Sequence, residues 1–131
     1  MLTRRQFFYQ MGGVYLLGGL LAGCGVTNRE PDYTVAIRGD ASFEPSSLTI
    51  PLGSMVAWHN QTDHVHTITS DRAKAQMAER IVIPEGASPF DSGDLFSGER
   101  WVHAFDTPGT YIYFCRYHET DEMLGAIVVT A

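Results

Sequence analysis

The stretch "FCRYHETDEML", Phe114 to Leu124, contains three side chains of the kinds that bind metal ions. They are the thiol of Cys115, the imidazole of His118 and the thioether of Met123, in the spacing C-x2-H-x4-M. These ligand types suit copper, which needs a fourth ligand from elsewhere in the chain. A lone cysteine or methionine is usually just packed in a core, but the joint spacing at the end of a strand favours a metal site.

A predicted strand brings Cys115 to this site. Alternation along "TYIYFC" places Tyr111, Tyr113 and Cys115 on one face, which we take as the inward one. The loop that follows is long enough for His118 and Met123 to fold around the same point as Cys115.

The fourth ligand is expected to be a histidine from another strand. His64 and His66 lie in "WHNQTDHVHTITS", where a loop re-enters a strand, and the spacing alone does not choose between them because residues two apart on an extended chain face the same side. His59 and His103 are expected to be exposed strand residues outside the site. Two imidazoles, a thiolate and a long, weak thioether form the electron-transfer type of copper site.

Short segments rich in β-branched and aromatic residues surround these candidate ligands. They predict an all-β sandwich of seven or eight strands, over residues 33–39, 47–50, 54–60, 66–70, 100–107, 110–115 and 125–130. One helix is predicted over residues 70–81, where Ala73, Met77 and Ile81 recur at intervals of four. This helix is expected to lie on the sandwich as an insertion.

The first residues have the layout of an export signal. "TRRQFF" resembles the twin-arginine motif, and "LAGC" resembles a lipobox in which Cys24 is lipidated. We therefore expect a signal over residues 1–23, a lipidated N-terminus and linker over 24–32, and one domain over 33–131. The alternative is an uncleaved membrane anchor, because residues 6–28 carry no charge. Both place the domain outside the cytoplasm and hold it to a membrane.

Charge and cysteine content exclude several functions. Removal of residues 1–23 leaves seven basic and fifteen acidic residues, a net charge of −8, which argues against nucleic-acid binding. Lipidation of Cys24 would leave Cys115 as the only thiol and exclude an internal disulfide. A nucleophile elbow and a second cluster of histidines are both missing from the sequence, so we expect no enzyme.

Two long stretches resemble the cupredoxins, in particular the plastocyanin-like group of small blue copper proteins that includes halocyanin. They are "FEPSSLTIPLGSMVAWHNQTDHVHTITS" and "FDTPGTYIYFCRYHETDEMLGAIVV", and the resemblance covers about Tyr33 to Ala131. It implies an eight-stranded Greek-key sandwich that holds one type 1 copper ion. The implied ligands are His66, as the histidine of the "HT" pair, with Cys115, His118 and Met123. Asn60 and Thr67 are implied to hydrogen-bond around the site.

The resemblance also implies single-electron transfer between membrane-associated redox proteins, such as a cytochrome, a reductase or an oxidase, by a monomeric domain. His118 would be the exit for the electron, and Leu124 would lie in the contact patch. The acidic residues Glu119, Asp121 and Glu122 follow His118, where relatives often have Gly and Pro, and we expect them to steer a basic partner. The alternative function is a copper carrier or storage protein without electron transfer.

Overall fold

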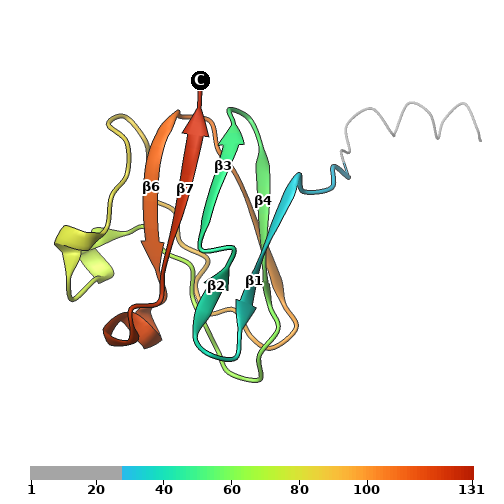
Figure 1. Cartoon of the computed structure of the whole chain (residues 1–131), viewed down its shortest axis with the longest axis vertical. Helices are drawn as coiled ribbons and strands as arrows, with labels where there is room; N and C mark the ends of the chain where they lie inside the picture. The colour runs from blue at the N-terminus through green and yellow to red at the C-terminus, as the bar shows by residue number, and fades with distance from the viewer. Residues whose placement is uncertain (1–27) are drawn as a thin grey trace, which may run out of the picture. The chain divides into compact units, whose positions relative to one another are not determined.

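The structure is a computed structural model that describes residues 28–131. The predicted signal and Cys24 lie outside the described residues. Within residues 28–131, no helix is long and apolar enough to cross a membrane. The same residues form seven strands and three short 3-10 helices (Figure 1): β1 (Tyr33–Arg38), β2 (Ser42–Glu44), β3 (Ser47–Pro51), β4 (Met55–Asn60), η1 (Arg72–Lys74), η2 (Ala78–Arg80), β5 (Arg100–Ala104), β6 (Gly109–Phe114), η3 (Arg116–Asp121) and β7 (Leu124–Thr130).

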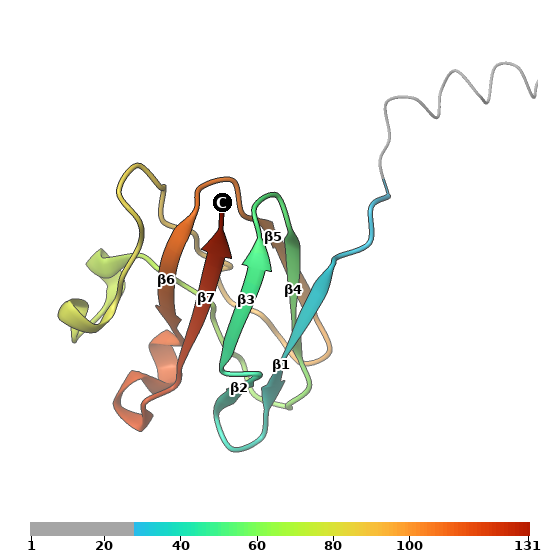
Figure 2. The same cartoon turned by 45° about the horizontal axis from the view of Figure 1, so that its top comes forward.

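The strands form two sheets, one with the order β2-β1-β4-β5 and the other with the order β3-β7-β6 (Figures 1 and 2). The pairs β1–β4 and β3–β7 are parallel, whereas β1–β2, β4–β5 and β6–β7 are antiparallel. Parallel neighbours need a crossover connection, so the chain passes repeatedly between the sheets. The predicted all-β sandwich is confirmed.

The core lies between the sheets and follows the alternation of side chains along each strand. In β7 the buried positions are Gly125, Ile127 and Val129, while the residues between them are partly exposed. Trp58 of β4 is fully buried and packs edge-on against Tyr113 of β6, with ring centres 5.5 Å apart. Burying an aliphatic or aromatic side chain contributes roughly 1.5–3 kcal/mol, so this layer fixes the two sheets against each other.

Gly125 is required by the packing of Tyr113 from the neighbouring strand. The two residues are direct partners in the β6–β7 pair. A Cβ atom on residue 125 would lie 2.3 Å from Cζ of the Tyr113 ring, closer than atoms can approach. Because Gly125 is two residues after Met123, the tyrosine ring packs directly beside the end of the predicted ligand loop.

The prediction of a helix over residues 70–81 is wrong. η1 and η2 are single turns separated by extended backbone, with φ −94° and ψ 143° at Ala75. In an α-helix the amides of Gln76 and Met77 would donate to carbonyls four residues earlier. They donate instead to the carboxylate of Glu119, so a contact from a distant segment replaces the helical hydrogen bonds.

Two further details differ from the predicted strands. Residues 66–70 form only isolated bridges, which join His66 to Leu95, and Thr69 to both Asp91 and Phe114. The short strand β2 is absent from the predicted segments. The sandwich therefore has seven strands over residues 28–131, with a bridged segment where another was expected.

Candidate metal centre

The predicted ligands gather at the end of the sandwich where β6 ends and β7 begins (Figure 1). Cys115 directly follows β6, Met123 directly precedes β7, and His118 lies between them in η3. His66 belongs to a distant part of the chain, held by its bridge to Leu95. His66 and Cys115, which are 49 positions apart in the sequence, thus come within 3.7 Å of each other.

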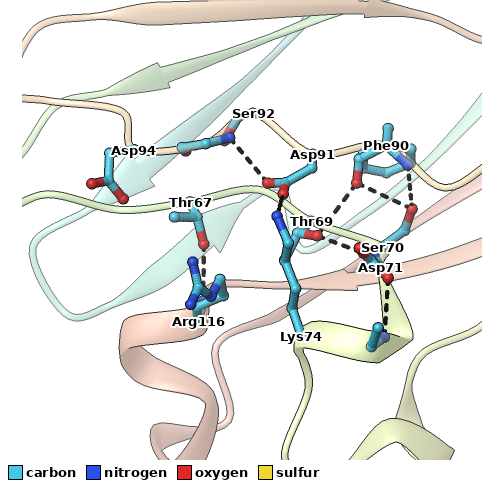
Figure 3. A network of polar contacts seen from close by, with 12 residues as sticks. Thr67, Thr69, Ser70, Asp71, Lys74, Phe90, Asp91, Ser92, Asp94 and Arg116 are labelled. Carbon is cyan, nitrogen blue, oxygen red and sulfur yellow. Dashed lines mark hydrogen bonds and ion pairs between the residues drawn. The ribbon is translucent and has the colours of Figure 1, made fainter.

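The sulfur of Cys115 is fully buried and receives a hydrogen bond. The backbone amide of Thr67 donates to Sγ over 3.4 Å. The hydroxyl of the same threonine accepts from the amide of Arg116 over 2.9 Å (Figure 3). An N–H directed at the sulfur holds it in one position. Thr67 therefore fixes the cysteine from both sides, and the contacts predicted for this residue are confirmed.

His66 is buried, with 2% of its surface exposed. Its Nδ1 lies 3.7 Å from Cys115 Sγ, and its Nε2 lies 3.0 Å from Thr62 Oγ1. Burial lowers the pKa of His66, and the nearby imidazoles of His118 and His64 lower it further because a second positive charge would be repelled. The ring is therefore kept neutral, the form in which it can bind a metal.

The hydrogen bonds of Thr62 decide which nitrogen of His66 carries the proton. Thr62 Oγ1 lies 2.7 Å from Asn60 Oδ1, and two oxygens this close need a hydrogen between them. The amide nitrogen of Asn60 donates to two backbone carbonyls, which identifies Oδ1 as the carbonyl oxygen of this side chain. Because a carbonyl oxygen carries no hydrogen, the hydrogen comes from the Thr62 hydroxyl. A hydroxyl has only one proton, so His66 Nε2 must donate to Thr62. Its Nδ1 is left with a free lone pair that faces Cys115.

Backbone hydrogen bonds hold His118 and Met123 to Cys115. The amide of His118 donates to Cys115 O, the amide of Met123 to His118 O, and the amide of Cys115 to Met123 O, each over 3.2 Å. The ring centres of His118 and His66 are 5.0 Å apart. Met123 is 1% exposed, whereas the side chain of His118 is 28% exposed. His118 is therefore the candidate ligand that reaches the surface.

The types and spacing of the donor atoms fit copper. Metal–nitrogen bonds of about 2.0–2.1 Å and metal–sulfur bonds of about 2.3 Å are usual for zinc. With bonds of similar length, one ion could bind both His66 Nδ1 and Cys115 Sγ, which are 3.7 Å apart. His118 Nδ1 instead lies 3.4 Å from Asp121 Oδ2. Over residues 28–131, no three His, Cys, Asp or Glu side chains are closed around one point.

Comparisons with known proteins agree with this chemistry. Residues 32–130 match the family described as copper binding proteins of the plastocyanin/azurin family. A plastocyanin from Scenedesmus fuscus is 36% identical over 105 residues, which cover 75% of this chain and 99% of the relative. The chain belongs to the plastocyanin/azurin family of copper-binding proteins. Like the other members of this cupredoxin family, it binds a single copper ion.

Two solved structures show where this cupredoxin fold is used. A purple cupredoxin from Nitrosopumilus maritimus has a TM-score of 0.58 and 26% identity, with 76% of this chain and 100% of that chain covered. A copper-containing nitrite reductase from Thermus scotoductus has a TM-score of 0.61 and 28% identity, with 81% of this chain covered but only 24% of the enzyme. The fold thus occurs both as a small protein and as one part of a larger enzyme.

The acidic loop of this cupredoxin differs from its prediction. Glu119 is 4% exposed, because its carboxylate accepts from the amides of Gln76 and Met77 over 2.9 and 2.7 Å. The expectation that it belongs to an exposed contact surface is therefore wrong. Asp121 and Glu122 are exposed, and Glu122 forms an ion pair with Arg80 over 3.2 Å. Leu124 is partly exposed at the start of β7.

The remaining histidines lie away from the sulfur. The side chain of His64 is 75% exposed and lies 3.7 Å from Asp63, so His66 and not His64 is beside Cys115. His59 and His103 are half-buried, not exposed as expected. The ring of His103 packs 4.8 Å from that of Phe90 and stacks 5.5 Å from Trp101, at 13° between their planes.

Sequence reasoning missed Thr62, which sets the proton position of His66. The signal was present, because Thr62 precedes His66 by four residues and follows Asn60 by two. A threonine two residues after an asparagine often forms local hydrogen bonds in a turn. The role of Asn60 was expected, and its side chain indeed bonds to His64 O and Leu95 O over 2.8 and 2.9 Å.

Proposed function

We propose that the protein transfers single electrons through a type 1 copper ion held by His66, Cys115, His118 and Met123. The observation that carries the proposal is the 3.7 Å approach of the bare Nδ1 of His66 to Cys115 Sγ, supported by membership of the copper-binding family. The copper ion supplies the one-electron change between its cuprous and cupric states. The protein supplies ligands that keep their positions when that charge changes.

Rigidity of the ligands is the property that electron transfer demands, since any movement of ligands adds to the barrier. Cys115 and Met123 are buried and tied to one another through the backbone. Thr67 holds the sulfur of Cys115, and Thr62 holds the ring of His66. His118 is partly exposed and is therefore the route by which an electron leaves for a partner.

We infer that the partner is a redox protein with a basic surface, such as a cytochrome, a reductase or an oxidase. Asp121 and Glu122 are exposed beside His118 and would attract positive charge in a salt-dependent way. Leu124 would contribute an apolar contact.

We also propose a location outside the cytoplasm, on a membrane, through a lipid on Cys24. A Cys24→Ser variant that is processed and still retained on the membrane would contradict the lipid anchor.

The copper site is tested by the spectrum and the redox titration of the purified, copper-loaded protein. We expect an intense visible band from charge transfer between the Cys115 thiolate and cupric copper, and a reversible one-electron reduction. Cys115→Ser should lose both the band and tight copper binding. A Cys115→Ser protein that keeps the band would refute the site. Tight binding without reversible reduction would favour a carrier or storage protein instead.

The basic partner is tested by the ionic-strength dependence of electron transfer to a basic cytochrome. Asp121→Asn with Glu122→Gln should slow the reaction at low salt and flatten its salt dependence. Glu85→Gln with Asp106→Asn is the matched control, because it removes two exposed charges that lie outside the copper loop. Equal effects of both pairs would leave only net charge as the cause and would refute local steering.

A further inference from the structure

Residues 70–91 form part of the long connection between β4 and β5, and the copper chemistry does not explain them. This segment contains η1 and η2, and it returns to the sandwich where Val82 bridges Ile112 of β6. Its two ends are held together, since Lys74 forms an ion pair with Asp91 and Ser70 bonds to Phe90 (Figure 3). The segment is thus a closed, ordered unit beside η3 (Figures 1 and 3).

The closest tie between this segment and the copper loop is the side chain of Glu119. Its Oε1 accepts from the amide of Gln76 over 2.9 Å, and its Oε2 accepts from the amide of Met77 over 2.7 Å. Glu119 is 4% exposed. Burying a carboxylate is costly unless hydrogen bonds compensate it, and these two amides provide that compensation. Arg80 and Glu122 add an ion pair between the same two segments.

Glu119 directly follows His118, at the point where η3 departs from helical geometry. η3 is interrupted at His118, whose φ of −132° and ψ of 28° are not helical. On the other side of His118, the hydroxyl of Tyr117 donates to Asp94 over 2.7 Å. Both neighbours of His118 are therefore held by side-chain contacts to residues 23 to 43 positions away in the chain.

We propose that Glu119 is a positioning residue for His118 and that residues 70–91 are the brace to which it is anchored. This inference rests on the proposed function, because it takes His118 as a copper ligand. The brace holds the backbone of His118 in place and so limits the positions that its ring can take beside the metal. Without the brace, the loop would sample several orientations and the copper would lose a fixed fourth ligand.

The contact itself is tested without copper, by amide hydrogen exchange in the metal-free protein. Glu119→Gln keeps the size of the side chain but turns one acceptor into a donor that faces an N–H. A hydrogen bond to a charged group contributes more than a neutral one, so exchange at Gln76 and Met77 should accelerate about tenfold or more. Glu79→Gln, in the same brace but exposed, should leave both rates unchanged. Unchanged rates in Glu119→Gln would overturn the inference.

The positioning role is tested by copper binding and by the paramagnetic resonance spectrum of the cupric protein. Glu119→Gln should lower copper affinity roughly 10- to 100-fold, as loss of supporting contacts around metal ligands does, and should give a broadened or mixed spectrum. Accelerated exchange together with wild-type affinity and spectrum would show a merely structural anchor and would overturn the inference. His118→Ala distinguishes failure of the proposed function from failure of the brace. If this variant leaves the copper site intact, His118 is not a ligand and the proposed ligand set is wrong.

A measurement on the wild-type chain covers the case in which Glu119→Gln does not fold. Coupling between two sites is reciprocal, so loading with cuprous copper should slow exchange at Gln76 and Met77 relative to the metal-free protein. The amide of Ser54, which bonds to Pro51 in the turn between β3 and β4, is the control and should not respond. Equal responses at all three amides, or none at Gln76 and Met77, would overturn the inference.

Discussion

Removal of the Thr62 hydroxyl by Thr62→Val should disturb the metal centre without touching a ligand. Valine nearly matches threonine in shape but leaves His66 Nε2 and the amide of His64 without their partner. Each buried group left unpaired costs about 1–3 kcal/mol, and the amide of His64 is only partly buried, so the free energy of unfolding of the metal-free protein should fall by roughly 2–4 kcal/mol. Thr62→Ser keeps the hydroxyl and should lose much less.

The same variant should also change the proton position on His66. Nitrogen NMR of the metal-free protein should find the proton on Nε2 in the wild type and in Thr62→Ser, but a mixture of the two neutral forms in Thr62→Val. Copper affinity should fall with it, by roughly 10- to 100-fold. A wild-type ring with its proton on Nδ1, or a Thr62→Val ring identical to the wild type, would refute the proton assignment.

Three further predictions concern the site and its support. His66→Ala should open the copper coordination and alter the visible spectrum, whereas His64→Ala should leave it nearly unchanged; the reverse result would mean that the wrong histidine was chosen. Gly125→Ala should lower the free energy of unfolding by about 3 kcal/mol or more, measured by denaturant titration, because the new methyl group collides with Tyr113. Burial lowers the pKa of His103, so the unfolded chain binds a proton there first, and the contribution of this residue should lower stability as the pH drops below about 6.5, the ordinary pKa of histidine. Replacing His103 by Gln should remove that part of the pH dependence, and an unchanged profile would exclude this residue as its source.

The inward face of β6 could be predicted from the sequence because alternation in a strand is a local property. Tyr111, Tyr113 and Cys115 are 3%, 0% and 0% exposed, as expected. By the same alternation Phe114 lies on the opposite face, and it is nevertheless fully buried. Thr69, from the segment between β4 and β5, pairs with the backbone of Phe114 at the edge of the sheet. Alternation determines which residues share a face, but only the tertiary structure determines whether that face is covered.

One contact accounts for the two clearest failures of the sequence predictions. The helical spacing over residues 70–81 and the acidic stretch after His118 were each interpreted locally. The bonds from Gln76 and Met77 to Glu119 remove the amides that a helix would use and bury a carboxylate that was expected to face solvent. A pairing across 42 and 43 positions has no local signature in a single sequence.

The position of β7 in its sheet has a consequence for how the chain matures. β7 lies between β3 and β6, although it follows both in the sequence. Until residues 124–130 leave the ribosome, the facing edges of β3 and β6 stay open, and the nascent chain carries two unpaired strands with apolar faces. Such edges pair readily with other chains. A chain truncated before residue 124 would therefore be an aggregation-prone intermediate.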